Sequence, residues 1–349
     1  RGNIRTLDKV IRREFQLVEG DAFNTAKLRR SLRNVRSLGF FETIDISPEV
    51  GSTDDKSIIE VEVSERSTGE FSFGAGFSTT DDVIADVSVR ERNLLGKGQD
   101  LRASIGLSTR RQSIDLSFTE PFFLDRNVAA GFDVFRRRRE QRESSFDENS
   151  IGFALRANFP IAQFLRQSVS YGLRSVDIED VDILASRFIR DQEGQTVTSE
   201  IGYALTYDLR DDAIEPSEGF VIRGRQNLAG IGGDARYLRT TLDYAQYFPI
   251  LKELTGIVSL KEGFIVGLGQ DVRINERFFL GGNSFRGFKS SGVGPRDRGT
   301  DDALGGNLFY VGSVEGRFPL GLPDEFGILG RVFTEFGSLT LVDDSGTNV

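Results

Sequence analysis

Residues 70–78 read Glu-Phe-Ser-Phe-Gly-Ala-Gly-Phe-Ser, and apolar residues alternate strictly with small or polar ones along this stretch. Successive side chains of a β-strand point to opposite faces, so the alternation predicts a strand with one apolar and one small, polar face. The apolar face carries Phe71, Phe73, Ala75 and Phe77. One apolar face beside one polar face is what a strand needs to lie between lipid and a wet interior.

The same period of two continues along most of the remaining chain. We count about 13 such stretches, each roughly nine to twelve residues long, which is the length that a tilted strand needs to cross hydrocarbon. The alternating apolar positions that mark them lie within 69–78, 83–92, 101–107, 114–118, 128–134, 151–159, 169–173, 197–209, 220–222, 236–248, 255–268, 308–318 and 327–338. A helical membrane span is excluded because no run of about 18 apolar residues occurs.

The connections between these stretches alternate in length. Short ones lie at 93–99, 121–126, 160–166 and 319–326, and long ones lie at 137–147, 177–196 and 269–304. Aromatic residues adjoin proline at the short connections, as in Pro121-Phe122-Phe123, and this pairing suggests a girdle at the membrane interface. Short turns on one side and long loops on the other are typical of a transmembrane antiparallel β-barrel. We therefore predict a mainly β protein with this barrel at 67–349.

The composition excludes several classes of function. The 349 residues carry a net charge of −9 from 44 basic and 53 acidic side chains, which argues against a nucleic-acid surface. The chain has no Cys and no His, so thiol and imidazole nucleophiles, bases and metal ligands are excluded. The glycine pairs near 74–76 and 281–282 lack the following helix and lysine of a phosphate loop. We expect no catalytic residue, no metal and no cofactor, and thus a protein that is not an enzyme.

Residues 1–66 form a separate α+β module. Apolar residues at helical spacing predict one helix around Val10 and a second one that begins at Asn24-Thr25 and ends at Gly39. Two strands are predicted at 41–50 and 57–63. A two-stranded sheet is marginal by itself, so a first strand of this module is expected upstream of Arg1.

The long connection at 269–304 contains the sequence Phe-Phe-Leu-Gly-Gly-Asn-Ser-Phe-Arg-Gly-Phe at 278–288. A loop of this length inside a barrel is expected to fold into the lumen. Strand parity turns Glu315 and Glu335 toward the lumen on neighbouring strands, where Arg286 is the natural fork-shaped partner for both. The alternative is that both glutamates simply face water.

Two further polar stretches lie at strand ends. Tyr207-Asp208-Leu209-Arg210-Asp211 places Asp208 and Arg210 on the lumen face, either as part of a salt-bridged interior or in a specific structural role. The run Arg136 to Arg139, with Arg142, is followed at once by acidic residues. It is expected to be a solvated strand end, and the alternative is a site for anionic lipid or lipopolysaccharide.

Several motifs resemble the family of outer-membrane β-barrel assembly factors, which join POTRA domains to a transmembrane barrel. Residues 1–66 resemble the last POTRA domain, here lacking its first strand, through the sequences at 1–3, 12–15, 19–21 and 38–41. The barrel resemblance is carried by Thr68-Gly69, Asn93 to Gly98, Thr119-Glu120-Pro121, Tyr207 to Asp211, and Phe285-Arg286-Gly287-Phe288. Family barrels have 16 strands, so the resemblance implies that the last three strands are absent and that 67–349 is a C-terminally truncated barrel.

The resemblance implies roles for particular residues. Arg286 corresponds to the arginine of a lid-loop motif, Phe285 to Phe288, and Glu315 and Glu335 correspond to its acidic partners. Tyr207, Asp208, Arg210 and Asp211 correspond to a structural motif of the barrel. The first barrel strand corresponds to the edge of a lateral gate and carries Gly69, Phe71, Phe73, Gly74, Gly76 and Phe77.

The resemblance also implies a function. The chain is expected to insert unfolded outer-membrane protein clients into the bacterial outer membrane by edge-strand templating, without nucleotide, with its POTRA domain in the periplasm. Implied partners are the clients, accessory lipoproteins bound through POTRA, and outer-membrane lipid and lipopolysaccharide. A related POTRA-barrel translocator that secretes a passenger is the alternative, and a passive porin is a third hypothesis that the N-terminal module disfavours.

Overall fold

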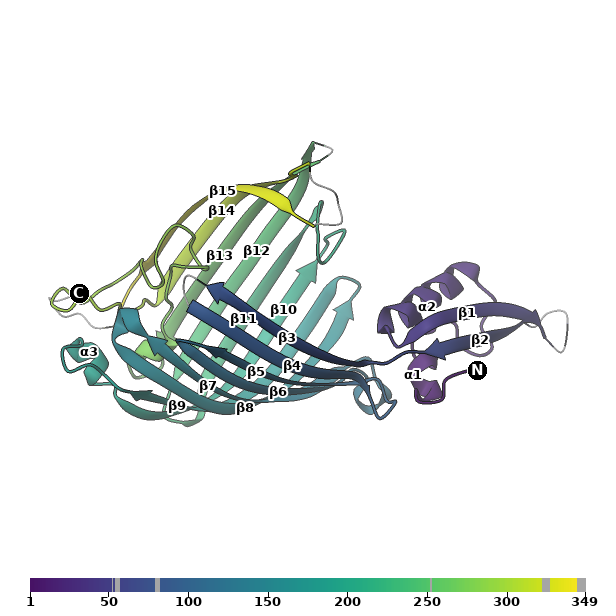
Figure 1. Ribbon diagram of the computed structural model, residues 1–349, viewed down its shortest axis with the longest axis horizontal. Coiled ribbons are helices and arrows are strands. Elements are labelled where there is room, and N and C mark those ends of the chain that lie inside the picture. The colour runs from purple at the N-terminus through teal and green to yellow at the C-terminus, as the bar shows by residue number, and fades with distance from the viewer. Residues whose placement is uncertain (52, 54–56, 79–81, 252, 322–326, 344–349) are drawn as a thin grey trace.

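The computed structural model describes residues 1–349 except 52, 54–56, 79–81, 252, 322–326 and 344–349. The chain forms a small α+β module and a large, strongly curved β-sheet that the chain enters directly after the module (Figure 1). Among the described residues, no helix has the length and apolarity that a membrane crossing requires.

The N-terminal module contains two helices and a two-stranded antiparallel sheet. Its elements are α1 (Asp8–Arg12), α2 (Thr25–Leu38), β1 (Phe41–Val50) and β2 (Ser57–Glu65). Asn24 caps α2 by accepting hydrogen bonds from the amides of Ala26 and Lys27, and Gly39 ends the helix at φ 70°. The core consists of Val10, Ile11, Val35, Phe40, Phe41 and Val63. The predicted order of helix, helix, strand, strand is confirmed.

Among the residues that the structure describes, the barrel sheet has 13 strands in chain order from β3 to β15, and each strand pairs antiparallel with the next. The strands are β3 (Gly69–Ser78), β4 (Asp82–Leu94), β5 (Gln99–Ser108), β6 (Arg111–Glu120), β7 (Ala129–Gln141), β8 (Phe146–Ala162), β9 (Leu165–Glu179), β10 (Gly194–Asp208), β11 (Gly219–Gly233), β12 (Tyr237–Leu251), β13 (Leu254–Gly267), β14 (Leu308–Pro319) and β15 (Leu329–Thr340). The mainly β fold and the number of strands predicted from the alternation are confirmed.

The lengths of the strands differ from the prediction. The strands from β8 to β12 have 15 to 17 residues rather than roughly nine to twelve. β7 also runs to Gln141, into the segment 137–147 that was predicted to be a loop. The reason is that charged residues of β7 are paired across the sheet, as in Arg137 with Asp115 at 2.6 Å, so the ladder continues past the point where apolar alternation ends.

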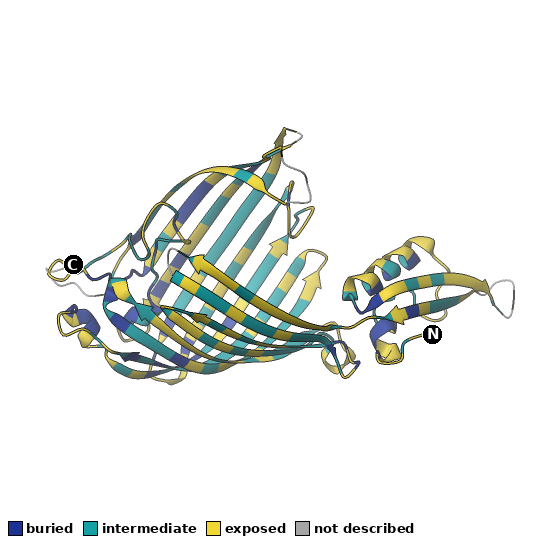
Figure 2. Ribbon diagram, in the orientation of Figure 1, coloured by how far each residue is buried: buried dark blue, intermediate teal, exposed yellow. Residues whose placement is uncertain are grey.

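The outer face of the sheet carries exposed apolar side chains. Phe71, Phe73 and Phe77 of β3 are 72%, 69% and 74% exposed, and the outward positions of β14 and β15 follow the same rule, with Val314 at 48% and Val332 at 67%. Figure 2 shows exposed residues alternating with less exposed ones along the strands. Large exposed apolar side chains at every second position form a surface suited to lipid.

Two long connections cover the end of the sheet that lies away from the module. The segment 180–193 joins β9 to β10 and contains α3 (Arg187–Arg190), and the segment 268–307 joins β13 to β14 and contains η3 (Ile274–Glu276). Apolar residues from both segments and from the strands pack together: Phe146, Ile178, Phe188, Ile189, Ile274 and Leu304. The connection 268–307, called the lid loop below, is therefore a packed element.

Candidate functional site

Arg286 at the tip of the lid loop contacts two carboxylates on the inner face of the sheet. Its Nε donates to Glu335 Oε1 at 2.6 Å, its backbone amide donates to Glu335 Oε2 at 2.7 Å, and its Nη1 donates to Glu315 Oε2 at 3.1 Å. The side chains of Glu315 and Glu335 are only 9% and 11% exposed. The guanidinium also lies 3.5 Å from the centroid of the Phe333 ring. The structure thus brings Arg286 of the loop together with the two glutamates that strand parity turns inward, and the alternative that both glutamates simply face water is wrong.

The neighbours of Arg286 fix the shape of the loop tip. Phe285 is 5% exposed and packs in a cluster with Leu280, Val311 and Leu339. Phe288 stacks on Phe285 with ring centroids 4.8 Å apart. Gly287 adopts φ +89°, a region that favours glycine, and this residue allows the chain to bring Phe288 back over Phe285.

A second anchor of the lid loop, which the sequence did not reveal, is Glu276. Its side chain is 2% exposed, and both of its carboxylate oxygens accept from Arg174 Nη2, at 2.7 and 2.6 Å. Thr198 Oγ1 donates to the same carboxylate at 3.3 Å, and Arg239 donates to the backbone carbonyl of Glu276. Burial opposes the ionisation of Glu276, but the charges of Arg174 and Arg239 prevail and hold its pKa below the ordinary value.

Strand parity predicts the inner-face position of the wall residues around Glu276. Arg174 and Glu200 alternate with outward apolar residues and so belong to the inner face. Tyr237 donates to Glu200 at 2.8 Å and completes the polar cluster. The sequence marks the wall residues, but nothing in the loop sequence distinguishes Glu276 from its neighbours as their partner.

The lid loop has a third set of contacts, with the connection 180–193. The amide of Ser186 donates to Asp302 at 2.6 Å, and its hydroxyl donates to Asp297 at 2.5 Å. The Ser186 hydroxyl and the amide of Gly299 hold the pKa of Asp297 below its ordinary value. The lid loop is therefore held at its tip, at η3 and along its later half.

The predicted gate strand is β3, which has the bounds Gly69–Ser78 and lies at one end of the sheet. Among the described residues, it pairs only with β4. A side chain at Gly74 would meet Asp86 Oδ1 at 2.5 Å, whereas one at Gly76 would meet no atom within 4 Å. Gly74 and Gly76 therefore give β3 little side-chain contact on its inner face, while Gly69 lies on the outer face with the phenylalanines.

The motif at Tyr207 to Asp211 organises the turn between β10 and β11. Arg210 donates to both oxygens of Asp208, at 2.8 and 2.7 Å. Asp211 accepts from the hydroxyl and the amide of Ser217 and from the amide of Glu218, and these bonds strongly lower its pKa. Tyr207 packs edge-on against Phe220 at 5.7 Å. These contacts fix the conformation of the turn that joins β10 to β11.

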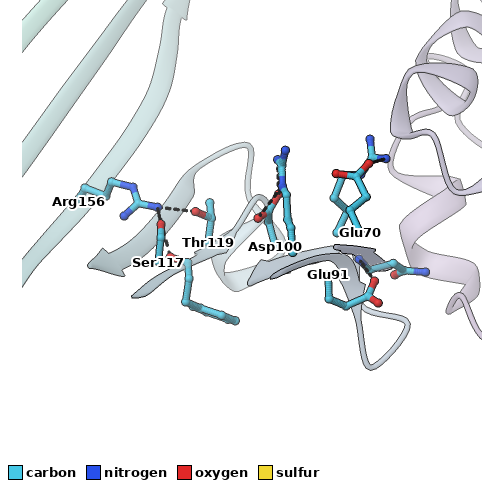
Figure 3. Close-up of polar contacts among 10 residues, drawn as sticks. Glu70, Glu91, Asp100, Ser117, Thr119 and Arg156 are labelled. Atoms are coloured by element: carbon cyan, nitrogen blue, oxygen red, sulfur yellow. Dashed lines mark hydrogen bonds and ion pairs between the residues drawn. The ribbon is translucent and has the colours of Figure 1, made fainter. Parts of the chain in front are cut away.

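Polar side chains line the inner face of the first strands near the module. Figure 3 shows the guanidinium of Arg156 directed at Ser117 and Thr119, and the next pair along is Arg90 with Asp100 at 2.5 Å. Glu70 of β3 accepts from Arg92 of β4. The inner face is thus hydrophilic where the outer face is apolar.

Three arginines of the basic run, Arg137, Arg138 and Arg142, are paired with carboxylates. Arg138 contacts Asp147 at 3.0 Å and Asp180 at 3.1 Å, and Arg142 contacts Glu140 at 2.7 Å. These pairs agree with a solvated strand end.

Comparison with known proteins defines the class. The model of the Omp85 superfamily domain matches residues 93–348, and the model of POTRA, described as a surface antigen variable number repeat, matches residues 1–66. The chain therefore belongs to the Omp85 superfamily, whose fold is the transmembrane β-barrel observed here.

Within this superfamily, the chain is similar to several individual proteins. The chain is 33% identical over 347 residues to the outer membrane protein assembly factor BamA of Neorickettsia risticii, covering 98% of this chain and 46% of that protein. The crystal structure of BamA from Haemophilus ducreyi lacking POTRA domains 1–3 has a TM-score of 0.81 at 22% identity, with 97% of this chain and 70% of that chain covered. CdiB from Acinetobacter baumannii has a TM-score of 0.58 at 15% identity, with 99% and 62% covered, and shows the fold alone. The chain spans about half the length of the curated BamA relatives that it matches.

Proposed function

We propose that this chain is the membrane-embedded part of an insertase that folds β-barrel proteins into the bacterial outer membrane. The observation that carries the proposal is the position of β3 at the end of the sheet, with pairing to β4 on one side only among the described residues. Unpaired backbone groups of an edge strand are a template for another strand. The similarity to proteins named outer membrane protein assembly factor supports the same reading.

The proposed mechanism consists of strand pairing and involves no bond chemistry. A client strand pairs with β3, and each new strand pairs with the last, so that no unpaired backbone enters lipid. The free energy comes from the folding of the client, and no nucleotide is consumed. The three glycines of β3 favour exchange of partners because glycine weakens a strand.

In this proposal the lid loop keeps the lumen closed while the edge is in use. Arg286 joins the loop to β14 and β15, the strands at the opposite end of the sheet from β3. The tip takes its shape from Phe285, Gly287 and Phe288. Glu315 and Glu335 bind the positively charged guanidinium of Arg286. The N-terminal module lies in the periplasm, where it receives clients and binds accessory lipoproteins, while outer-membrane lipid and lipopolysaccharide surround the wall.

The test is client folding into liposomes that contain the full-length protein. We expect the protein to accelerate the appearance of the folded, heat-modifiable client after apyrase has removed all nucleotide. Arg286→Ala should slow this reaction, whereas Lys289→Ala, which removes an exposed cation of the same loop, should not. Dependence on nucleotide, or equal rates for the Arg286→Ala and native proteins, would defeat the proposal.

The alternative is a POTRA-barrel translocator that secretes a passenger. It receives less support, because the relatives that are 28% to 33% identical to this chain are named outer membrane protein assembly factors. The same liposomes separate the two functions, since a translocator protects an added passenger inside the vesicle and does not fold a client barrel. Steady conductance without either activity would identify a porin.

A further inference from the structure

A cavity of about 540 Å³ lies where the N-terminal module meets the barrel, between α1 and the first turns of the sheet. The module is fixed to this end of the barrel, since the amide of Leu7 donates to the carbonyl of Gly96 at 2.9 Å and Asn93 Nδ2 donates to Thr6 Oγ1 at 2.8 Å. The cavity belongs neither to the lid loop nor to the edge strand, and no feature described above uses it.

One wall of the cavity is apolar and continuous with the lipid-facing surface. Phe118, Phe132 and Leu155 occupy one row across β6, β7 and β8, because Phe118 is opposite Phe132 and Phe132 is opposite Leu155. The rings of Phe118 and Phe132 stack at 5.5 Å, and Leu155 is 51% exposed. A row of this kind on the outer face is in contact with acyl chains.

The other end of the cavity is cationic. Lys9 and Arg13 line it from the module, and Lys97 lines it from the turn between β4 and β5. Lys9 has an exposed contact with Asp125 at 3.2 Å, and Lys97 forms no salt bridge with any residue that the structure describes. The Arg13 guanidinium lies over the Phe122 ring at 4.3 Å, with its Nε buried and without a hydrogen-bond acceptor in the described part of the chain. The lining also contains Arg156, which is paired with Asp133, and the carboxylates Glu120 and Asp125, so cations predominate.

The turn beside the cavity has the character of a membrane interface. Phe123 and Leu124 in this turn are 47% and 75% exposed, next to the cations of the cavity. Exposed aromatic and aliphatic residues beside Lys and Arg are typical of the level at which lipid headgroups lie. The lining of the cavity therefore combines outward apolar side chains of β6, β7 and β8 with cations of the module and of the turn between β4 and β5.

We propose that this cavity, which we call the hinge pocket, binds one anionic glycerophospholipid of the periplasmic leaflet. Its phosphate contacts Lys9 and Lys97, and an acyl chain lies along Phe118, Phe132 and Leu155. The leaflet follows from the proposed periplasmic position of the module. Such a lipid would join the module to the barrel wall and limit the movement of α1 relative to the first turns.

Native mass spectrometry of the full-length protein in detergent tests the hinge pocket, with dimyristoyl phosphatidylglycerol and dimyristoyl phosphatidylethanolamine as probes. The native protein should retain one phosphatidylglycerol in preference to phosphatidylethanolamine. The double variant Lys9→Gln, Lys97→Gln should bind it about tenfold or more weakly, because two cations near the headgroup are lost. The matched control is Lys27→Gln, Lys289→Gln, which removes one cation from the module and one from the barrel, each in an exposed ion pair. It should bind like the native protein.

A second variant tests the apolar end without changing charge. Ala130→Trp adds bulk on the outer wall of the pocket and should also weaken retention. Equal lipid retention by the double variant Lys9→Gln, Lys97→Gln and by the native protein would overturn the proposal. Displacement of the lipid by an equimolar amount of glycerol phosphate would also overturn it, because it would indicate a simple anion site. Because lipid retention is measured without a client, loss of insertase activity with retained binding would refute the proposed function and leave the hinge pocket standing.

Discussion

The strands β3 and β9 are two extremes within one sheet. β3 has 10 residues, three of them glycine, and pairs only with β4 among the described residues. β9 has 15 residues, pairs with β8 and β10 along nearly its whole length, and carries Arg174, which binds the lid loop through Glu276. The difference shows that the wall combines a firmly built part that holds the loop with a weakly built edge.

The largest loss of stability is expected from removing the ion pair between Glu276 and Arg174 in the firmly built part of the wall. Glu276→Ala leaves Arg174 buried without its main partner, and loss of one member of a buried pair costs about 3 to 5 kcal/mol. Urea unfolding in detergent micelles, followed by heat-modifiability, should show this loss. Glu143→Ala removes an ion pair with the exposed Lys289 and should cost less than about 1 kcal/mol. Equal losses in the two variants would show that the Glu276 pair contributes no more to stability than an exposed ion pair of the same loop.

Because of Glu276, the stability of the fold is also expected to depend on pH. The pKa of Glu276 is lower in the folded protein than in the unfolded chain, so its ion pair stabilises the fold fully above the unfolded value of about 4.3. This contribution should fall as the pH drops below that value toward the folded pKa. Unfolding measured between about pH 3 and pH 7 should show a decline in stability that is smaller in Glu276→Gln. An identical decline in the variant would assign the pH dependence to other groups.

Next in size is the tip of the lid loop. Glu335 accepts from both the amide and Nε of Arg286, whereas Glu315 accepts one bond from Arg286 and a second from Arg331 at 3.2 Å. Glu335→Gln should therefore release the tip more than Glu315→Gln, by about 1.5 to 3 kcal/mol. Limited proteolysis near residues 281–292 measures the release. Faster cleavage in Glu315→Gln than in Glu335→Gln would reverse the assignment of the main acceptor.

The smallest effect concerns the edge itself. Gly76→Val adds a β-branched side chain where no atom lies within 4 Å, so it should stiffen β3 by about 1 kcal/mol or less without a clash. Hydrogen exchange of the β3 amides should slow, and client folding should slow with it. Gly224 of β11 has equally open space but lies in a strand paired on both sides, so Gly224→Val should leave client folding unchanged. A similar loss of folding in both variants would indicate a general effect of the substitution.

The features of the barrel that could be predicted from the sequence follow from the alternation of apolar and polar residues at every second position. Alternation located the 13 barrel strands that the structure describes. An outer face in lipid requires apolar side chains and an inner face in water accepts polar ones, so residue type changes at every second position. Parity also placed Glu315 and Glu335 on the wall opposite Arg286, since neighbouring strands turn such residues to the same side.

Other features carry no local pattern. The ends of β7 and β8 depend on cross-strand ion pairs and on apolar packing against the long connections, as in the burial of Phe146 beside Leu304. The anchoring role of Glu276 depends on where the lid loop comes to rest, which involves residues more than 70 positions away. The hinge pocket joins residues of α1 to those of β6, β7 and β8, so only the folded chain brings them together.

The most direct test of the account is a disulfide between the edge strand and a client during assembly. The 349 residues contain no Cys, so Ser72→Cys in β3 and Ser170→Cys in β9 each introduce a single thiol into this part of the protein. Neighbouring strands lie close enough for a disulfide, so a client with one cysteine in its terminal strand should cross-link to position 72 and not to position 170. Client folding that proceeds at the normal rate with equal or no cross-linking at the two positions would contradict edge-strand templating.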